Sequence, residues 1–147
     1  MKPRFFVIFS LLFGLIAAPG LMSGETTSEI KPDDAQAIHV IVQSQLNALA
    51  EDDAAGAFAL ATMSTRTRLG NPDNFLRLIK EEYKPIYRHR LALFSAPEII
   101  DGNIIQVVRL TDGENHVWLA VYQMVKEAGG EWRVDGCQLL ETTSISI

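Results

Sequence analysis

The spacing of hydrophobic residues changes once along this chain, at Pro85, and this change constrains the fold more than any other feature. Before Pro85, apolar residues recur at intervals of three and four, as at Ile38, Ile41 and Val42, which is typical of an amphipathic helix. After it, segments rich in β-branched and aromatic residues are separated by turn residues, which is typical of strands. Helices followed by strands predict an α+β domain, because a parallel sheet would need a helix between successive strands.

Three helices are expected in the first half of the domain. The first begins at Pro32, a residue that suits the first turn of a helix. The second is an alanine-rich piece over residues 54–63, and the third follows a cap at Asn71 or Asp73. Strands are expected over residues 87–93, 104–110, 117–125 and 132–140. We therefore expect three N-terminal helices packed on a strongly bent, four-stranded antiparallel sheet.

The third expected strand is apolar on both of its faces. One face carries Val117, Leu119, Val121 and Val125, and the other carries Trp118, Ala120, Tyr122 and Met124. Helices cover only one side of a single sheet, so the second apolar side needs a partner. We expect a homodimer through the outer sheet face and assign Trp118, Tyr122 and Met124 to that face; a sheet that wraps onto itself is the alternative.

The N-terminus predicts export. Lys2 and Arg4 precede an uncharged stretch over residues 5–22, and small residues follow it. The expected organisation is a signal peptide over residues 1–24, a flexible lead-in over residues 25–31 and a single domain over residues 32–147. The domain is expected in the periplasm or secreted. Alternatively, residues 5–22 stay uncleaved and anchor it to the membrane, since they are just long enough to span a thin bilayer.

Charge and cysteine content bear on two further points, which are nucleic-acid binding and disulfide formation. All 18 acidic residues lie after residue 24, whereas two of the 13 basic residues lie before it, so the exported part is acidic. This excludes a nucleic-acid-binding protein, which needs clustered Lys and Arg. Cys137 is the only cysteine, so no intramolecular disulfide forms. Its apolar neighbours predict a buried thiol.

No motif in the sequence points to a catalytic residue, a metal site or a cofactor. The three histidines, His39, His89 and His116, lack the spacing of metal ligands. Asp52 and Asp53 are adjacent, so on a helix they would point apart, and capping is the simpler role for them. We expect a protein without metal, cofactor or catalytic group.

Six residues are candidates for a ligand pocket, because aromatic walls with a few polar tips are typical of small-molecule sites. They are Tyr83, Tyr87, Arg88, Arg109, Trp118 and Gln123. Ordinary packing at the mouth of a small cone would account for the same residues. A small apolar ligand is the partner that this pocket would take.

Four segments carry a resemblance to known proteins. The expected order of three helices followed by a bent four-stranded sheet, together with the run over residues 50–61, resembles the cystatin-like cone of the nuclear transport factor 2-like superfamily. Residues 69–75, 83–88 and 132–137 are similar to a bacterial family of exported proteins classed as a domain of unknown function. The resemblance implies the fold but no reaction, because the superfamily contains enzymes, ligand carriers and binding modules.

Together these observations predict an exported, non-catalytic binding or interaction module. The first alternative is an isomerase or hydrolase that uses the cavity of the cone. The second is a structural dimerisation module built on the outer face of the sheet.

Overall fold

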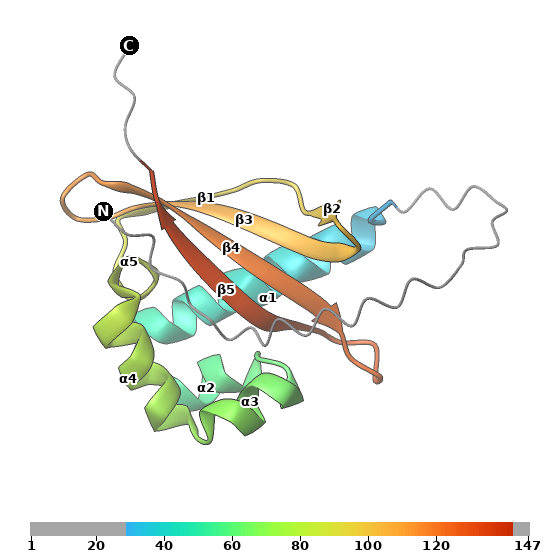
Figure 1. The fold of residues 1–147 in the computed structure, drawn as a ribbon, viewed down its shortest axis with the longest axis horizontal. Coiled ribbons are helices and arrows are strands. Elements are labelled where there is room, and N and C mark those ends of the chain that lie inside the picture. Colours follow the sequence, from blue (N-terminus) through green and yellow to red (C-terminus); the bar gives the residue numbers. More distant parts are fainter. Residues whose placement is uncertain (1–28, 143–147) are drawn as a thin grey trace, which may run out of the picture.

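The computed structural model describes residues 29–142, in which helices precede an antiparallel sheet (Figure 1). The helices are α1 (Pro32–Ala50), α2 (Ala54–Ala59), α3 (Met63–Leu69), α4 (Pro72–Glu82) and α5 (Lys84–Tyr87). The strands are β1 (Leu91–Phe94), β2 (Glu98–Ile100), β3 (Asn103–Thr111), β4 (Val117–Lys126) and β5 (Trp132–Glu141). The α+β class is confirmed. The predicted signal peptide or anchor lies outside the described residues, as does most of the lead-in.

Helix α1 begins at Pro32 as predicted and packs lengthwise against the sheet (Figure 1). Pro32 fits the first turn because a backbone N–H there has no partner within the helix. The side chains of Ile38, Val42, Leu46 and Leu49 recur on one stripe and are at most 1% exposed. This stripe and the face of the sheet beneath it form the core of the domain.

The helical region contains five segments rather than the three expected, because the predicted helix over residues 54–63 already ends at Ala59, and α3 and α5 are additional helices. Helix α2 is capped by Asp53, whose carboxylate accepts a hydrogen bond from the Gly56 N–H at 2.9 Å. The chain then extends, and the Thr62 N–H donates to the Val134 carbonyl of β5 at 2.9 Å. Thr62 also caps α3 through its side chain. Pairing with the sheet thus ends one helix and starts the next.

Pro85 lies inside a short helix rather than at the start of a strand. Asn71 caps α4, whose last turn ends at Tyr83, and the chain turns directly into α5. Pro85 occupies the first turn of α5, where proline is tolerated. The first strand therefore begins at Leu91, and the expectation of a strand over residues 87–93 is corrected to β1.

The sheet has five strands in the order β1-β3-β4-β5, and β2 also pairs with β3. β2 was not expected. It continues along the same edge of β3 after a break at Ser95, whose carbonyl accepts a hydrogen bond from the buried Gln106 side chain at 2.6 Å. The sheet is not strongly curled, which corrects the expected strong bend. Strong bends require bulges or glycine kinks, and the described strands have one bulge, between Gln123 and Met124, and one extra residue between β1 and β2 opposite β3.

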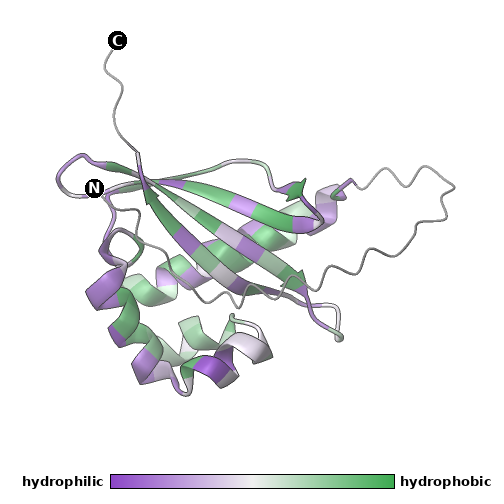
Figure 2. Ribbon diagram, viewed as in Figure 1, coloured by the Kyte–Doolittle hydropathy of each residue, from purple (hydrophilic) through white to green (hydrophobic). Residues whose placement is uncertain are grey.

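The two faces of the sheet are the reverse of the expected assignment. Tyr122 and Met124 are at most 2% exposed and belong to the core, and Trp118 packs against the same core. The opposite face of β4 carries Val121 and its alternating neighbours, which are partly exposed. β4 is apolar along much of its length (Figure 2), so the pattern alone did not say which of its faces the helices cover. Trp118, Tyr122 and Met124 are therefore not on an outer dimer face.

We predict that Leu46→Ala lowers the free energy of unfolding by about 3 kcal/mol, because it leaves a cavity between α1 and the sheet. Urea denaturation followed by circular dichroism measures the change. Val40→Ala is the control: Val40 lies on the same helix but is 47% exposed, so a change within about 0.5 kcal/mol is expected. Equal losses in the two variants would contradict the packing described for α1.

Candidate functional site

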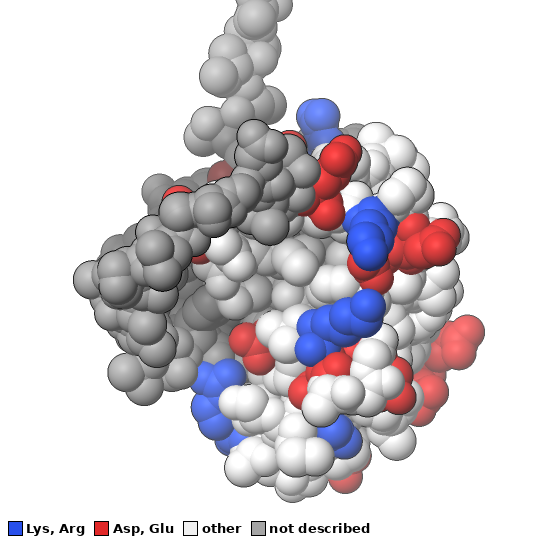
Figure 3. All heavy atoms as spheres, turned by 90° about the vertical axis from the view of Figure 1, so that its right-hand side faces the viewer, with Lys and Arg blue, Asp and Glu red and all other residues white. Residues whose placement is uncertain are grey.

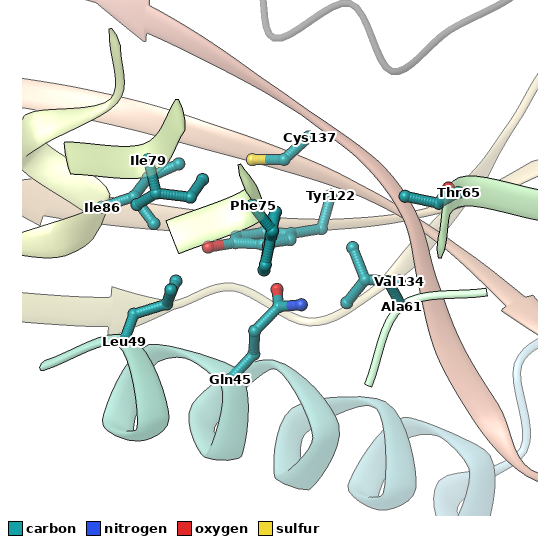
Figure 4. Close-up of a pocket in the computed structure, with 10 residues that line it drawn as sticks. All are labelled: Gln45, Leu49, Ala61, Thr65, Phe75, Ile79, Ile86, Tyr122, Val134 and Cys137. Atoms are coloured by element: carbon teal, nitrogen blue, oxygen red, sulfur yellow. The ribbon is translucent and has the colours of Figure 1, made fainter. Parts of the chain in front are cut away.

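The space between α1 and the sheet is filled by side chains (Figure 4). The cavity that remains there has a volume of about 10 Å³, which is room for roughly one water molecule. Its lining residues are Gln45, Leu49, Ala61, Thr65, Phe75, Ile79, Ile86, Tyr122, Val134 and Cys137. The interior of the domain is thus a packed core with a few polar groups.

Two of those polar groups are Tyr122 on β4 and Cys137 on β5 (Figure 4). The Tyr122 hydroxyl makes no hydrogen bond of normal geometry among the described residues, and it interacts only weakly with the Cys137 thiol beside it. Burial raises the pKa of Tyr122 well above its usual value, and the neighbouring Cys137 thiol adds to the effect. Burial also raises the pKa of Cys137 far above its usual value. Both groups are therefore neutral at physiological pH, and the prediction of a buried Cys137 is confirmed.

We predict that Tyr122→Phe leaves the free energy of unfolding unchanged or raises it by up to about 1 kcal/mol. The reason is that the substitution removes a buried hydroxyl that makes no hydrogen bond of normal geometry and has only the weak Cys137 thiol beside it. Tyr87→Phe is the matched control and should lower stability, because the Tyr87 hydroxyl donates to Asp52 and accepts from Arg88. Urea denaturation compares the two variants. A clearly lower free energy of unfolding in Tyr122→Phe would show that the Tyr122 hydroxyl makes a stabilising hydrogen bond and would contradict this prediction.

The six residues nominated from the sequence do not line one pocket. Tyr83 is 6% exposed and packs in the core. Arg109 and Gln123 lie on the outer face of the sheet, where Gln123 donates a hydrogen bond to Asn103 at 3.1 Å. Only Arg88 and Trp118 contribute to the same cleft.

Tyr87 and Arg88 form a brace at the C-terminal end of α1. The Arg88 guanidinium lies 3.8 Å from the centre of the Tyr87 ring and donates to the Ala50 carbonyl at 2.9 Å. Arginine at a helix C-terminus satisfies a carbonyl and complements the helix dipole. The Tyr87 hydroxyl donates to Asp52 and lowers the pKa of that carboxyl, and Lys80 lies 3.5 Å from it. The brace fixes α5 against α1.

A broad concave site lies where α4 and α5 meet the end of the sheet. This cleft has a volume of about 770 Å³, which is within the range of small-molecule sites. It is lined by Glu81, Glu82, Lys84, Pro85, Arg88, Asp112, Gly113, Glu114, His116, Trp118 and Glu141. We call it the α5 cleft. The sequence pattern did not reveal it, because its walls come from three segments far apart in the chain.

Asp112 organises one wall of the α5 cleft. Its carboxylate accepts hydrogen bonds from the backbone N–H groups of Glu114 and His116 at 2.8 and 2.9 Å, and from the Trp118 indole at 3.0 Å. Partial burial acts to raise the pKa of Asp112, but the hydrogen bonds outweigh it and the pKa is lowered. Asp112 therefore orients the Trp118 ring.

Carboxylates dominate the α5 cleft. Five acidic side chains line it, against Lys84 and Arg88 as permanent cations. Glu81, Glu82 and Glu141 have no hydrogen-bond or ion-pair partner among residues 29–142. On the side shown in Figure 3, basic and acidic side chains are interspersed without a large patch of either sign.

We predict that Asp112→Asn lowers stability at neutral pH and that its difference from the wild type shrinks on acidification. A carboxyl with a lowered pKa stabilises the fold above its unfolded value of 3.8 and loses that contribution as the pH falls through the folded value. Urea denaturation between about pH 7 and pH 2 tests this. Glu114→Gln is the control and should follow the wild-type curve. A constant difference at every pH would contradict the role of the Asp112 charge.

Residues 31–147 match the family model described as Domain of unknown function (DUF4864). The chain belongs to this family. The match confirms the resemblance to a domain of unknown function, whereas the nuclear transport factor 2-like fold and export stay predictions. No curated protein and no solved structure matches the chain.

Two further observations concern what the DUF4864 domain could hold. Within residues 29–142, no three His, Cys, Asp or Glu residues are grouped so that they could bind a metal ion. No helix in the same part of the chain is long and apolar enough to cross a membrane. The α5 cleft has the size of a small-molecule site.

Proposed function

We propose that this DUF4864 protein is an exported, non-catalytic binding module that takes a small organic cation in the α5 cleft. The observation that carries the proposal is a cleft of about 770 Å³ in which Trp118 forms one wall and carboxylates outnumber cations. The predicted signal over residues 1–24 supports export. The helices that precede and cover one face of the sheet also support a nuclear transport factor 2-like relationship.

The charges of the α5 cleft favour a cation over an anion. The Arg88 guanidinium is already engaged by the Ala50 carbonyl and by Tyr87, so its charge is directed at the end of α1. Lys84 is then the remaining permanent cation, opposite Glu81 and Glu141 and their acidic neighbours. Aromatic faces also attract cations, and a tryptophan gives the strongest such contact.

The lowered pKa and the hydrogen bonds of Asp112 support a role in ligand binding rather than in acid–base catalysis. A general acid or base is most effective when its pKa lies near the working pH. The pKa of Asp112 is shifted away from neutrality, and its oxygens already accept hydrogen bonds from Trp118 and two backbone groups. Its arrangement suits a structural support for the wall of a binding site.

The alternatives of an enzyme cavity or a small apolar ligand inside the cone have less support. Both need space between α1 and the sheet, where the cavity is about 10 Å³. A drug-sized ligand needs roughly 300 Å³ or more.

Calorimetric titration of the purified protein with hexamethylenediamine, at low salt, tests the proposal. This diamine carries two ammonium groups on an apolar chain; hexanediol has the same chain without charge and should not bind. Glu81→Gln and Glu141→Gln should each weaken binding about threefold, because each removes one exposed charge contact. Glu51→Gln removes an exposed carboxylate outside the cleft and should leave binding unchanged.

Equal binding of the diamine and the diol, or equal weakening by Glu51→Gln and Glu81→Gln, would contradict a specific cation site. Binding of an anion in place of the diamine would contradict the chemical class that we propose.

A further inference from the structure

The outer face of the sheet is an apolar surface that none of the described helices covers. The helices lie on the other side, and the buried residues of β3 and β4 alternate with partly exposed ones (Figure 1). Leu91 and Leu93 on β1 are 46% and 53% exposed. The apolar residues of this outer face are Leu91, Leu93, Ile105, Val107, Leu119, Val121, Val125 and Leu140. Such a surface is typical of an interaction site.

Two unpaired charges of opposite sign interrupt the outer face, besides Arg133, which pairs in register with Val125 and forms an ion pair with Glu131. Arg109 on β3 pairs in register with Leu93 and Leu119, and Glu98 on β2 pairs in register with Ile105, so both side chains project from the outer face. Neither Arg109 nor Glu98 has a hydrogen-bond or ion-pair partner among residues 29–142. Burying such a charge without a counter-charge is strongly unfavourable. Any protein that covers this face must therefore supply an acid near Arg109 and a base near Glu98.

A second copy of the chain supplies both charges. Val107 lies midway between Ile105 and Arg109 along β3 and pairs in register with Val121. Consider a two-fold axis that lies in the interface, parallel to the sheet, and runs across the strands over these two valines. It places the row of residues that contains Arg109 over the row that contains Glu98 in the other copy. The two charges are then offset by one strand spacing, about 4.8 Å, which an arginine side chain can span. Because a two-fold interface is isologous, the pair forms twice.

We propose that the protein forms a two-fold homodimer through the outer face of the sheet, with Arg109 of each copy paired to Glu98 of the other. The valines at the axis meet their own counterparts, and the leucines of β1, β4 and β5 fill the surrounding apolar surface. The α5 cleft lies at the end of the helical side of the sheet, so the dimer leaves it accessible.

Sedimentation velocity at micromolar protein concentration tests the dimer. The protein is purified in the form that the expressing cell produces, with or without residues 1–24. The wild type should sediment as a dimer. Arg109→Glu and Glu98→Arg should each weaken dimerisation at least tenfold, because each places like charges together across the axis. The double variant Arg109→Glu/Glu98→Arg should restore the dimer to within about threefold of the wild type.

Arg68→Glu is the matched control, because Arg68 is an exposed arginine on α3, away from the outer face. It should not change the dimer, and circular dichroism should show that all variants keep the fold. A monomeric wild type, or single reversals that leave the dimer intact, would overturn the proposal. A double variant that stays monomeric would overturn the Arg109–Glu98 pairing. The diamine titration is separate: loss of the dimer should leave binding in the α5 cleft unchanged.

Discussion

The packing of α1 against the inner face of the sheet is the contact on which the rest of the structure depends. Ile38, Val42 and Leu46 meet a layer of sheet residues that includes Val108 and Leu139, and all five are at most 1% exposed. Burial on this scale is the main favourable term in folding. α4 and α5 complete the core from one end, so their positions follow from α1 and the sheet.

The two walls of the α5 cleft are held by different means. On the helical side, the brace of Tyr87 and Arg88 fixes α5 to the C-terminal end of α1. On the sheet side, Asp112 closes the turn between β3 and β4 and holds the Trp118 ring. Because both walls are fixed by hydrogen bonds made within the protein, the cleft is formed before any ligand arrives, which lowers the entropic cost of binding.

The interior of the domain has no room for a small-molecule ligand, so a binding site must lie on its surface. The cavity beside Tyr122 admits roughly one water molecule, whereas the α5 cleft and the outer sheet face are both open. The two surfaces differ in chemistry: the cleft is rich in carboxylates, and the outer face is apolar with one unpaired charge of each sign. The proposed cation site and the proposed dimer interface therefore lie on different surfaces of this DUF4864 domain.

Local signals determined much of the fold. Pro32 and Asn71 mark helix starts, glycine-rich turns mark the strand ends, and the stripe through Ile38 and Leu46 marks the buried side of α1, because caps, turns and periodicity act within a few residues of sequence. Tertiary structure alone decided the rest. It ended the second helix early by pairing Thr62 with β5, and it chose which apolar face of β4 lies under α1. It also placed only Arg88 and Trp118 of the six nominated residues in the same cleft. Each of these outcomes depends on contacts between segments distant in the chain, for which the sequence carries no periodic signal.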